Sequence, residues 1–383
     1  MSNPAPLESY VVTIPGLEAV TTAELAELGI GVDATEPGGL SIRASLADLY
    51  RVNLWLRTAS RVTVRAARFH ARNFAELERR AKQVDWAPFV GQGREVHFRV
   101  SCRKSKLMHE KAVVERLFDT MKAKIRGVRL VAKLADEDPS AVQRFVVRVY
   151  RDECWISADT SGDLLHRRGY RLESTKAPLR ETLAAAMLLG AGWRGERPLV
   201  DPMCGSGTIV IEAAQLARRI PPGLYRSFAL QRWPIASGVP FEALRDAARE
   251  GIAARPLVAI RGSDRDAGAI AAATANAERA GVTGDIELTK APISDLATEE
   301  AEGLVLTNPP YGARVGERKA LRNLYAQLGN TLRKRAAGWD LGLLSADAML
   351  EAQTRIPLAE RYAVSNGGIR VRLVLGSVPR AGA

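Results

Sequence analysis

The spacing of apolar residues separates the first 160 residues from the rest of the chain. Strand-like runs alternate there with stretches in which apolar side chains recur as on one face of a helix. We therefore predict a mixed α+β region that ends in a polar linker over 159–177, containing Gly162 and Gly169. The expected strands cover 10–14, 61–66, 95–102, 128–134 and 145–151, and the expected helices cover 17–28, 46–54, 74–83 and 111–124.

The second half of the chain has the pattern of an α/β domain. Apolar runs of strand length end near positions 201, 264 and 307, and the segment 267–280 is alanine-rich with helical spacing. This alternation predicts a Rossmann-like sheet of parallel strands with helices on its faces. Near the C-terminus, Ser365-Asn366-Gly367-Gly368 separates two strand-like runs, which predicts a β-hairpin.

The run Asn308-Pro309-Pro310-Tyr311 follows the apolar strand 303–307 and carries the most informative chemistry. Each proline fixes its own φ and restricts the residue before it, and neither has an N–H to donate. The turn therefore offers carbonyl oxygens and the Asn308 amide beside the flat Tyr311 ring, which suits a nucleobase amine or a carboxamide. We take all four as candidate catalytic residues, although alone such a run is better explained as a turn that closes a strand.

A glycine-rich turn follows the strand that ends at Asp201. Gly205 and Gly207 allow a tight bend and close approach of a ligand, and the next helix presents free N–H groups to it. The turn lacks the lysine of a phosphate-binding loop and the third glycine of a dinucleotide fingerprint. A carboxylate at the strand end suits an ammonium group, which favours S-adenosylmethionine over ATP or NAD. The candidate cofactor residues here are Asp201, Cys204, Gly205, Ser206, Gly207 and Thr208.

Asp264 ends the next predicted strand and is placed to accept hydrogen bonds from both ribose hydroxyls of such a cofactor. Taken alone, it is equally well explained as a helix N-cap. Its position between the glycine-rich turn and Asn308 favours the binding interpretation, because open α/β sheets bind ligands at the carboxyl ends of neighbouring strands. Cys204 is interpreted as a small residue in the turn and not as a nucleophile, since no basic side chain lies near it in sequence.

Positive charge is concentrated in one part of the chain. Residues 51–150 hold 23 lysines and arginines against 10 acidic residues, whereas the whole chain has a net charge of +12. A segregated excess of this kind predicts a surface that binds the phosphates of a nucleic acid. The cluster of Arg103, Lys104 and Lys106 supplies candidate contacts.

Length and composition limit the remaining possibilities. A chain of 383 residues is expected to form two or three domains. No run reaches the roughly 18 apolar residues of a membrane span, and the first residues lack the basic start of an export signal. The three cysteines are widely separated and match no metal-binding pattern. We expect a reduced, cytoplasmic protein that uses no metal and contacts no membrane.

Together these motifs resemble those of the class I S-adenosylmethionine-dependent RNA methyltransferases that carry an N-terminal THUMP domain and methylate guanine N2. The resemblance covers nearly the whole chain. It includes 166–171 and 177–185 before the catalytic motifs, and Pro15-Gly16-Leu17-Glu18 with Glu24-Leu25 near the start. Pro221-Pro222-Gly223-Leu224, with Phe228 and Trp233-Pro234, is similar to the insertion that this family has between its first two catalytic strands.

The resemblance implies an N-terminal ferredoxin-like region at 1–60, a THUMP RNA-binding domain at 61–160 and a methyltransferase domain with a seven-stranded sheet at 161–383. It adds Thr182 and Ile293, beside Asn308, to the expected cofactor residues, and Arg167 and Arg168 to the expected RNA contacts. Pro292 stands where relatives place an aspartate that binds the adenine amine. Either Asp295 replaces that aspartate, or stacking and the Ile293 backbone hold the adenine.

The function implied is methyl transfer to guanine N2, with 23S ribosomal RNA favoured over transfer RNA as the partner, by a monomer. The Asn-Pro-Pro-Tyr run is shared with adenine-N6 and glutamine-N5 methyltransferases, so the residues alone leave the acceptor amine open. The basic segment disfavours a protein substrate. A non-catalytic RNA-binding factor is disfavoured because both catalytic motifs are intact.

Overall fold

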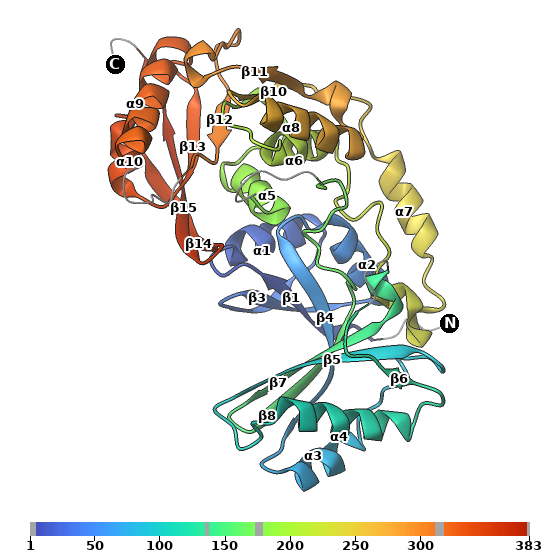
Figure 1. Cartoon of the computed structure of the whole chain (residues 1–383). Helices are drawn as coiled ribbons and strands as arrows, with labels where there is room; N and C mark the ends of the chain where they lie inside the picture. The colour runs from blue at the N-terminus through green and yellow to red at the C-terminus, as the bar shows by residue number, and fades with distance from the viewer. Residues whose placement is uncertain (1–4, 135–137, 173–178, 311–317, 381–383) are drawn as a thin grey trace. The chain divides into compact units, whose positions relative to one another are not determined.

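The computed structural model describes residues 5–134, 138–172, 179–310 and 318–380, which fold into two compact units (Figure 1). Unit 1 comprises the chain up to Thr13, Thr22–Leu165 and Tyr225–Ala247. Unit 2 comprises Ile14–Thr21, His166–Leu224 and the chain from Ala248 onward.

Unit 1 is built on an eight-stranded sheet in the order β2-β3-β1-β4-β8-β7-β5-β6. β5 pairs in parallel with β6 and β7, and the other neighbours are antiparallel. The strands are β1 (Leu7–Thr13), β2 (Val32–Glu36), β3 (Gly39–Ala44), β4 (Ala59–His70), β5 (Glu95–Arg103), β6 (Arg129–Leu130), β7 (Gln143–Tyr150) and β8 (Glu153–Asp159). The helices before residue 160 are α1 (Glu18–Glu27), α2 (Leu46–Trp55), α3 (Phe74–Ala81) and α4 (Glu110–Lys122).

Aromatic residues form a core between this sheet and α3 and α4. The Trp86 ring packs edge-on against Phe145, with 5.2 Å between ring centroids, and Phe98 stacks on Phe145 at 5.4 Å. Alternate side chains of each strand point into this core, as the period of a β-strand requires. Figure 1 shows α3 and α4 on the same side of β5, β7 and β8.

Most of the elements predicted in this half are confirmed, two predictions need correction, and three strands, β2, β3 and β8, were not predicted. The strand expected at 128–134 is the two-residue edge strand β6, whose side chains are exposed and so gain little from further pairing. β8 was missed because it follows β7 after a very short turn. The expected linker does not begin at 159, since Asp159 is buried and ion-paired with Arg61, and Ser161 Oγ donates to Asn53 Oδ1 over 2.6 Å.

Unit 2 contains the predicted seven-stranded α/β sheet, in the order β11-β10-β9-β12-β13-β15-β14. Its first five strands are parallel, and β15 runs antiparallel to β13 and β14, so the predicted hairpin is present. The strands are β9 (Leu199–Asp201), β10 (Ile260–Asp264), β11 (Glu287–Lys290), β12 (Leu304–Thr307), β13 (Asp340–Ser345), β14 (Ala359–Asn366) and β15 (Ile369–Ser377). The helices are α5 (Glu181–Gly190), α6 (Thr208–Ala217), α8 (Ala267–Arg279), α9 (Arg318–Arg335) and α10 (Ala348–Gln353), with the short 3-10 turn η5 (Ile293–Asp295).

β12 shows how both faces of this sheet are buried. Leu304 and Leu306 pack in the cluster that contains Val210 of α6, whereas Val305 packs on the other side with Leu328 of α9. A parallel strand covered on both faces needs apolar side chains on both, which explains the apolar run Leu304-Val305-Leu306 before the buried Thr307.

The segment 225–247 lies between β9 and β10 in sequence, as the family resemblance implied, but its residues pack in unit 1. The Phe228 ring packs edge-on against Tyr50 with 5.6 Å between centroids. Trp233 packs in the same way on Phe89, and its Nε1 donates to Gln143 Oε1 over 2.7 Å. The segment ends within the helix α7 (Phe241–Glu250), most of which therefore belongs to unit 1.

Candidate active site

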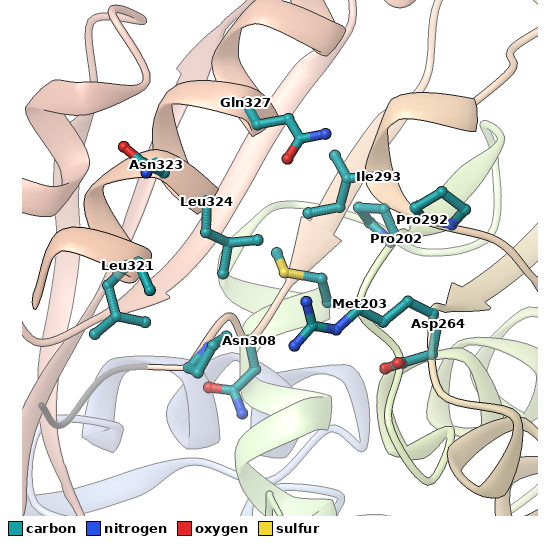
Figure 2. A pocket seen from close by; sticks show the side chains of 13 residues that line it. Pro202, Met203, Asp264, Pro292, Ile293, Asn308, Leu321, Asn323, Leu324 and Gln327 are labelled. Carbon is teal, nitrogen blue, oxygen red and sulfur yellow. The ribbon is translucent and has the colours of Figure 1, made fainter. Parts of the chain in front are cut away.

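The polar residues singled out in sequence lie at the carboxyl ends of three neighbouring strands of unit 2. Asp201 ends β9, Asp264 ends β10, and Asn308 follows β12. β9 pairs with both of the other strands. A cavity of about 550 Å³ opens at this edge (Figure 2). Its lining residues are Pro202, Met203, Asp264, Arg265, Pro292, Ile293, Asn308, Pro310, Ala320, Leu321, Asn323, Leu324 and Gln327.

The glycine-rich turn is held in one conformation by its neighbours. Gly207 precedes α6 with a φ of +82°, and a Cβ there would lie 2.9 Å from the Cβ of Ala273 in α8. Asn276 Nδ2 of the same helix donates to the Ser206 carbonyl over 3.0 Å. The turn therefore requires glycine at 207 both for its backbone angle and for the closeness of α8.

Asp264 connects the glycine-rich turn to the cavity. Its Oδ2 accepts a hydrogen bond from Gly205 N over 3.1 Å, and its Oδ1 accepts one from Asp266 N over 3.0 Å. These bonds fix the carboxylate at the cavity wall, and each oxygen keeps a further lone pair to accept from a ligand hydroxyl. The N-cap of the following helix is Asp266, so the alternative interpretation of Asp264 as the N-cap is wrong.

Asp201 is a buried carboxylate with 1% of its surface exposed. Burial raises its pKa to about 7, and the nearby Asp264 acts in the same direction, while the hydrogen bond from Met203 N opposes the rise. Among the described residues Asp201 has no ion-pair partner. It does not itself line the cavity, but Pro202 and Met203, which follow it, do. A buried carboxylate without a cation fits the ammonium group that the sequence suggested.

Cys204 lies in the turn between these two carboxylates. Its N–H donates to the Ser263 carbonyl over 2.9 Å, and its Sγ lies 3.4 Å from the position of a Cβ on Gly262. Burial and the two carboxylates raise the pKa of its thiol well above the ordinary value. A thiol held protonated in this way is a poor nucleophile, which agrees with its interpretation as a small structural residue.

Asn308 presents an amide to the cavity from the end of β12. Its Oδ1 is buried and accepts no hydrogen bond from any residue that the structure describes. Figure 2 places Asn308 on the opposite side of the cavity from Gln327. Pro310 lines the cavity with it, Pro309 is buried and is not among the lining residues, and Tyr311 lies outside the described residues. An unsatisfied buried amide oxygen is costly unless a ligand donates to it, so Asn308 Oδ1 marks a place for a donor.

The end of the cavity assigned to adenine is lined by Pro292 and Ile293. Asp295, which sequence analysis considered as a substitute for the missing aspartate, lies beyond Ile293 and is not among the lining residues. Across from Ile293, Leu324 and Gln327 of α9 reach the cavity (Figure 2).

Sequence analysis missed the whole contribution of α9. Its lining residues recur at helical spacing, namely Ala320, Leu321, Asn323, Leu324 and Gln327. That spacing is visible in the sequence, but it is also the spacing of an ordinary core-facing helix, and Leu328 and Leu332 of α9 do pack in the core. No local signal distinguishes the two kinds of face.

The remaining predicted residues lie away from the cavity lining. Thr182 is buried in α5, and its hydroxyl has no hydrogen-bond partner among the described residues. Arg103, Lys104 and Lys106 lie at the end of β5 and just beyond it in unit 1. Arg167 is exposed, whereas Arg168 is buried in unit 2, with its Nε 2.9 Å from Glu212 Oε1. The predicted RNA contact at Arg168 is therefore wrong, because its guanidinium is an internal partner of Glu212.

Within the described ranges, no cluster of histidine, cysteine, aspartate and glutamate side chains has an arrangement that would hold a metal ion. None of the helices in those ranges combines the length and the apolar character needed to cross a membrane.

A parallel sheet with a terminal antiparallel hairpin, and a cofactor-sized cavity beside a glycine-rich turn, defines a class I methyltransferase fold. Residues 168–374 match the model of the RMKL-like methyltransferase domain, and residues 8–63 match that of the RlmL ferredoxin-like domain. The chain belongs to the RMKL-like methyltransferase family.

Similar proteins cover most of the chain. A putative RNA methyltransferase, slr0064, from Synechocystis is 33% identical over 368 residues, with 95% of each chain covered. The ribosomal RNA large subunit methyltransferase K/L of Syntrophotalea carbinolica is 36% identical in an alignment of 386 positions, gaps included, that covers 97% of this chain. The chain spans about half the length of that relative, 53%.

Solved structures agree with this assignment. SMU.472, a putative methyltransferase complexed with SAH, superimposes with a TM-score of 0.87 at 28% identity, covering 99% of this chain and 100% of its own. A predicted N6-adenine-specific DNA methylase from Listeria monocytogenes has a TM-score of 0.84 at 30% identity, and the match covers 96% of this chain and 95% of its own. TrmN from Thermus thermophilus, at 22% identity and a TM-score of 0.71, shares the fold.

Proposed function

We propose that this protein transfers a methyl group from S-adenosylmethionine to the exocyclic N2 of a guanine in RNA, and that the RNA is 23S ribosomal RNA. The observation that carries the proposal is the buried Asn308 amide oxygen, which accepts no hydrogen bond from the described residues and lies beside a cavity that fits the cofactor. The names of the K/L relatives support ribosomal RNA as the substrate.

The residues that line the cavity, with Asp201 buried next to the lining residues Pro202 and Met203, fit S-adenosylmethionine. The Asp264 carboxylate would accept from the ribose hydroxyls, and the uncompensated Asp201 would attract the ammonium group. Pro292, Ile293 and Leu324 supply an apolar surface for the adenine. The amide of Gln327 lies at this end and can both donate to and accept from the polar edge of an adenine.

Asn308 and Pro309 position the acceptor amine. The guanine 2-amino group is conjugated with its ring, so its lone pair is poorly available. The Asn308 side-chain oxygen and the Pro309 carbonyl would accept its two hydrogens and so favour the tetrahedral nitrogen that attacks. Bound S-adenosylmethionine supplies the methyl group from its sulfonium.

Asn308 is neutral and cannot remove a proton, so the surplus proton leaves to water after the N–C bond has formed. Positioning and oriented dipoles supply the rate enhancement without a general base. Tyr311 is proposed to stack on the acceptor base once it has left its helix.

Unit 1 is proposed to bring the RNA. It holds the basic segment 51–150, in which Arg103, Lys104 and Lys106 remain candidate contacts. The ferredoxin-like match covers 8–63. Residues 61–160 are proposed to form a THUMP domain that binds RNA. The protein is proposed to act as a monomer in the cytoplasm.

A second candidate function is methylation of adenine N6 in RNA. A carbonyl and an amide oxygen would accept equally well from the adenine 6-amino group, and the Listeria relative is described as a predicted adenine methylase.

The experiment that separates these functions is methyl transfer from labelled S-adenosylmethionine to total RNA from cells that lack this gene. The RNA is separated by size, and its labelled nucleosides are identified by mass. Label in N2-methylguanosine of the large ribosomal RNA is the expected result. The same nucleoside in transfer RNA moves the substrate to that class, and N6-methyladenosine overturns the choice of base. Absence of label while the cofactor still binds overturns the proposal of RNA methylation.

A further inference from the structure

One face of the unit 1 sheet carries a regular array of arginine and aromatic side chains. α3 and α4 cover the other face of strands β4, β8, β7 and β5 (Figure 1). The strand register arranges the side chains of the uncovered face in three rows. We call these twelve residues the open face: Arg65, Ser157, Val146 and Arg99; Arg68, Trp155, Arg148 and Ser101; His70, Glu153, Tyr150 and Arg103.

The open face is strongly positive, with five arginines against one glutamate. Arg68 pairs with that glutamate, Glu153, and Arg65 lies 3.4 Å from Glu8 at the edge. Arg99, Arg103 and Arg148 are exposed and form no ion pair with any residue in the described part of the chain. Three unpaired guanidinium groups on neighbouring strands favour a polyanionic partner.

Two aromatic rings lie among these arginines. The guanidinium carbons of Arg68 and Arg148 lie 5.6 and 5.9 Å from the ring centre of Trp155. Those of Arg148 and Arg151 lie 5.5 and 5.3 Å from the ring centre of Tyr150. Both rings are half-buried, so their orientation is fixed by the sheet while part of each remains accessible. Cation–π contacts of this kind hold rings and guanidinium groups in one interleaved layer.

We propose that the open face binds single-stranded RNA. Unpaired bases would stack on Trp155, Tyr150 and the guanidinium planes, while Arg99, Arg103 and Arg148 bind the phosphates. A double helix would use the charges but not the rings, because its bases are already stacked on each other. This inference rests on the proposed function only in taking RNA as the substrate, and it assigns the surface that holds an unpaired segment of it.

The stacking part is tested by the affinity of the full-length chain for a fluorescein-labelled twelve-nucleotide oligouridine, measured by fluorescence anisotropy. Trp155→Ala is expected to raise Kd by roughly 5- to 100-fold, the range of a lost base–aromatic stack. Trp155→Phe keeps a ring and is expected to stay within about threefold of the wild type. If Trp155→Ala binds as tightly as Trp155→Phe, the stacking platform is overturned.

The charge part is tested by the salt dependence of the same binding. Arg148→Gln is expected to lower the slope of log Kd against log salt by about 0.7, the value for one phosphate contact to a single strand. Arg80→Gln is the matched control, because Arg80 is an exposed arginine on α3, the helix-covered side of the sheet. Equal slopes for Arg148→Gln and Arg80→Gln would show that the open face makes no phosphate contact and would overturn the inference.

Methyl transfer distinguishes a failure of this inference from a failure of the proposed function. If the wild type binds the oligonucleotide through Trp155 and Arg148 but methylates no guanine, the open face stands and the proposed function fails. The opposite outcome is that the wild type methylates guanine in RNA while Trp155→Ala and Arg148→Gln keep its Kd and its KM for RNA. In that case the proposed function stands and the open face is overturned.

Discussion

Asn308 is the residue whose loss should separate chemistry from binding. Asn308→Ala removes the buried amide oxygen that the proposed mechanism uses only on the reacting amine. We expect kcat to fall by about 10²–10³-fold, the usual loss for one oriented polar group, while the affinity for S-adenosylhomocysteine changes little. Single-turnover methyl transfer and calorimetric binding measure the two effects. Full activity in the variant would exclude Asn308 from the mechanism.

Asp201 should make cofactor binding depend on pH. Its pKa of about 7 in the folded chain means that a large part of the population carries a neutral carboxyl near neutral pH. An ammonium ligand favours the ionised form, so we expect affinity for S-adenosylhomocysteine to rise with pH up to about 7 and then level off. Calorimetric titrations between about pH 5.5 and 8.5 check this, because a group with a pKa of about 7 changes its protonation over roughly that range. Asp201→Asn should bind more weakly and without that rise, and a flat wild-type profile would contradict the assignment.

The same group has the opposite effect on the stability of the free protein. Its pKa is raised on folding from 3.8 to about 7, so the folded state keeps a proton that the unfolded state has lost. The contribution of Asp201 to stability is therefore greatest below the unfolded pKa, declines between the two values and is lowest above about 7. Ligand binding and folding respond to this one titration with opposite signs.

At the scale of elements, the junction of the glycine-rich turn with α6 and α8 should be the part of the site least tolerant of change. Gly207→Ala combines a left-handed backbone with a contact of 2.9 Å to Ala273, and should cost about 2–4 kcal/mol of unfolding free energy. Gly281→Ala is the matched control, with a φ of +67° and nothing within 4 Å, and should cost only about 1 kcal/mol. Urea unfolding measures both, and equal losses would show that contact with α8 is unimportant.

Elements were predictable where one physical cause decided the pattern. β12 begins with three consecutive apolar residues because both of its faces are buried, and the hairpin turn at 365–368 is marked by its glycines. The edge strand β6 was overestimated, because apolar residues predict a strand but do not say whether it has a partner along its whole length. Pairing partners lie far away in sequence, so the local pattern contains no information on them.

The sequence identified those site residues whose motif indicates one chemical role. It did not identify residues whose type and spacing suit several roles. Asp264 and Asn308 line the cavity, as their motifs indicated. Arg168 looked like a surface charge because nothing in its neighbourhood in sequence reveals Glu212, its partner from α6. Leu324 and Gln327 lie on a helix whose spacing suits a core face and a cavity face equally.

For the whole molecule, each unit is made of separate stretches of the chain, so dividing the chain at one position yields neither unit intact. A fragment beginning at His166 would lack the partners of Phe228 and Trp233, which are buried against Tyr50, Phe89 and Gln143 in unit 1. We expect that fragment to aggregate or to expose apolar surface, measured as increased binding of a hydrophobic dye relative to the full chain. A monodisperse fragment with native sheet content and no dye binding would contradict this expectation.

The placement of 225–247 also has a consequence for how the chain is made. The ribosome synthesises the chain from its N-terminus, so the strands of unit 1 up to β8 emerge before the segment 225–247 that completes the core of this unit. At about 5–20 residues per second, the roughly 60 residues between Leu165 and Phe228 would take about 3–12 seconds to appear. During that interval the apolar sites for Phe228 and Trp233 have no occupant, and we expect newly made unit 1 to bind chaperones that recognise apolar surfaces.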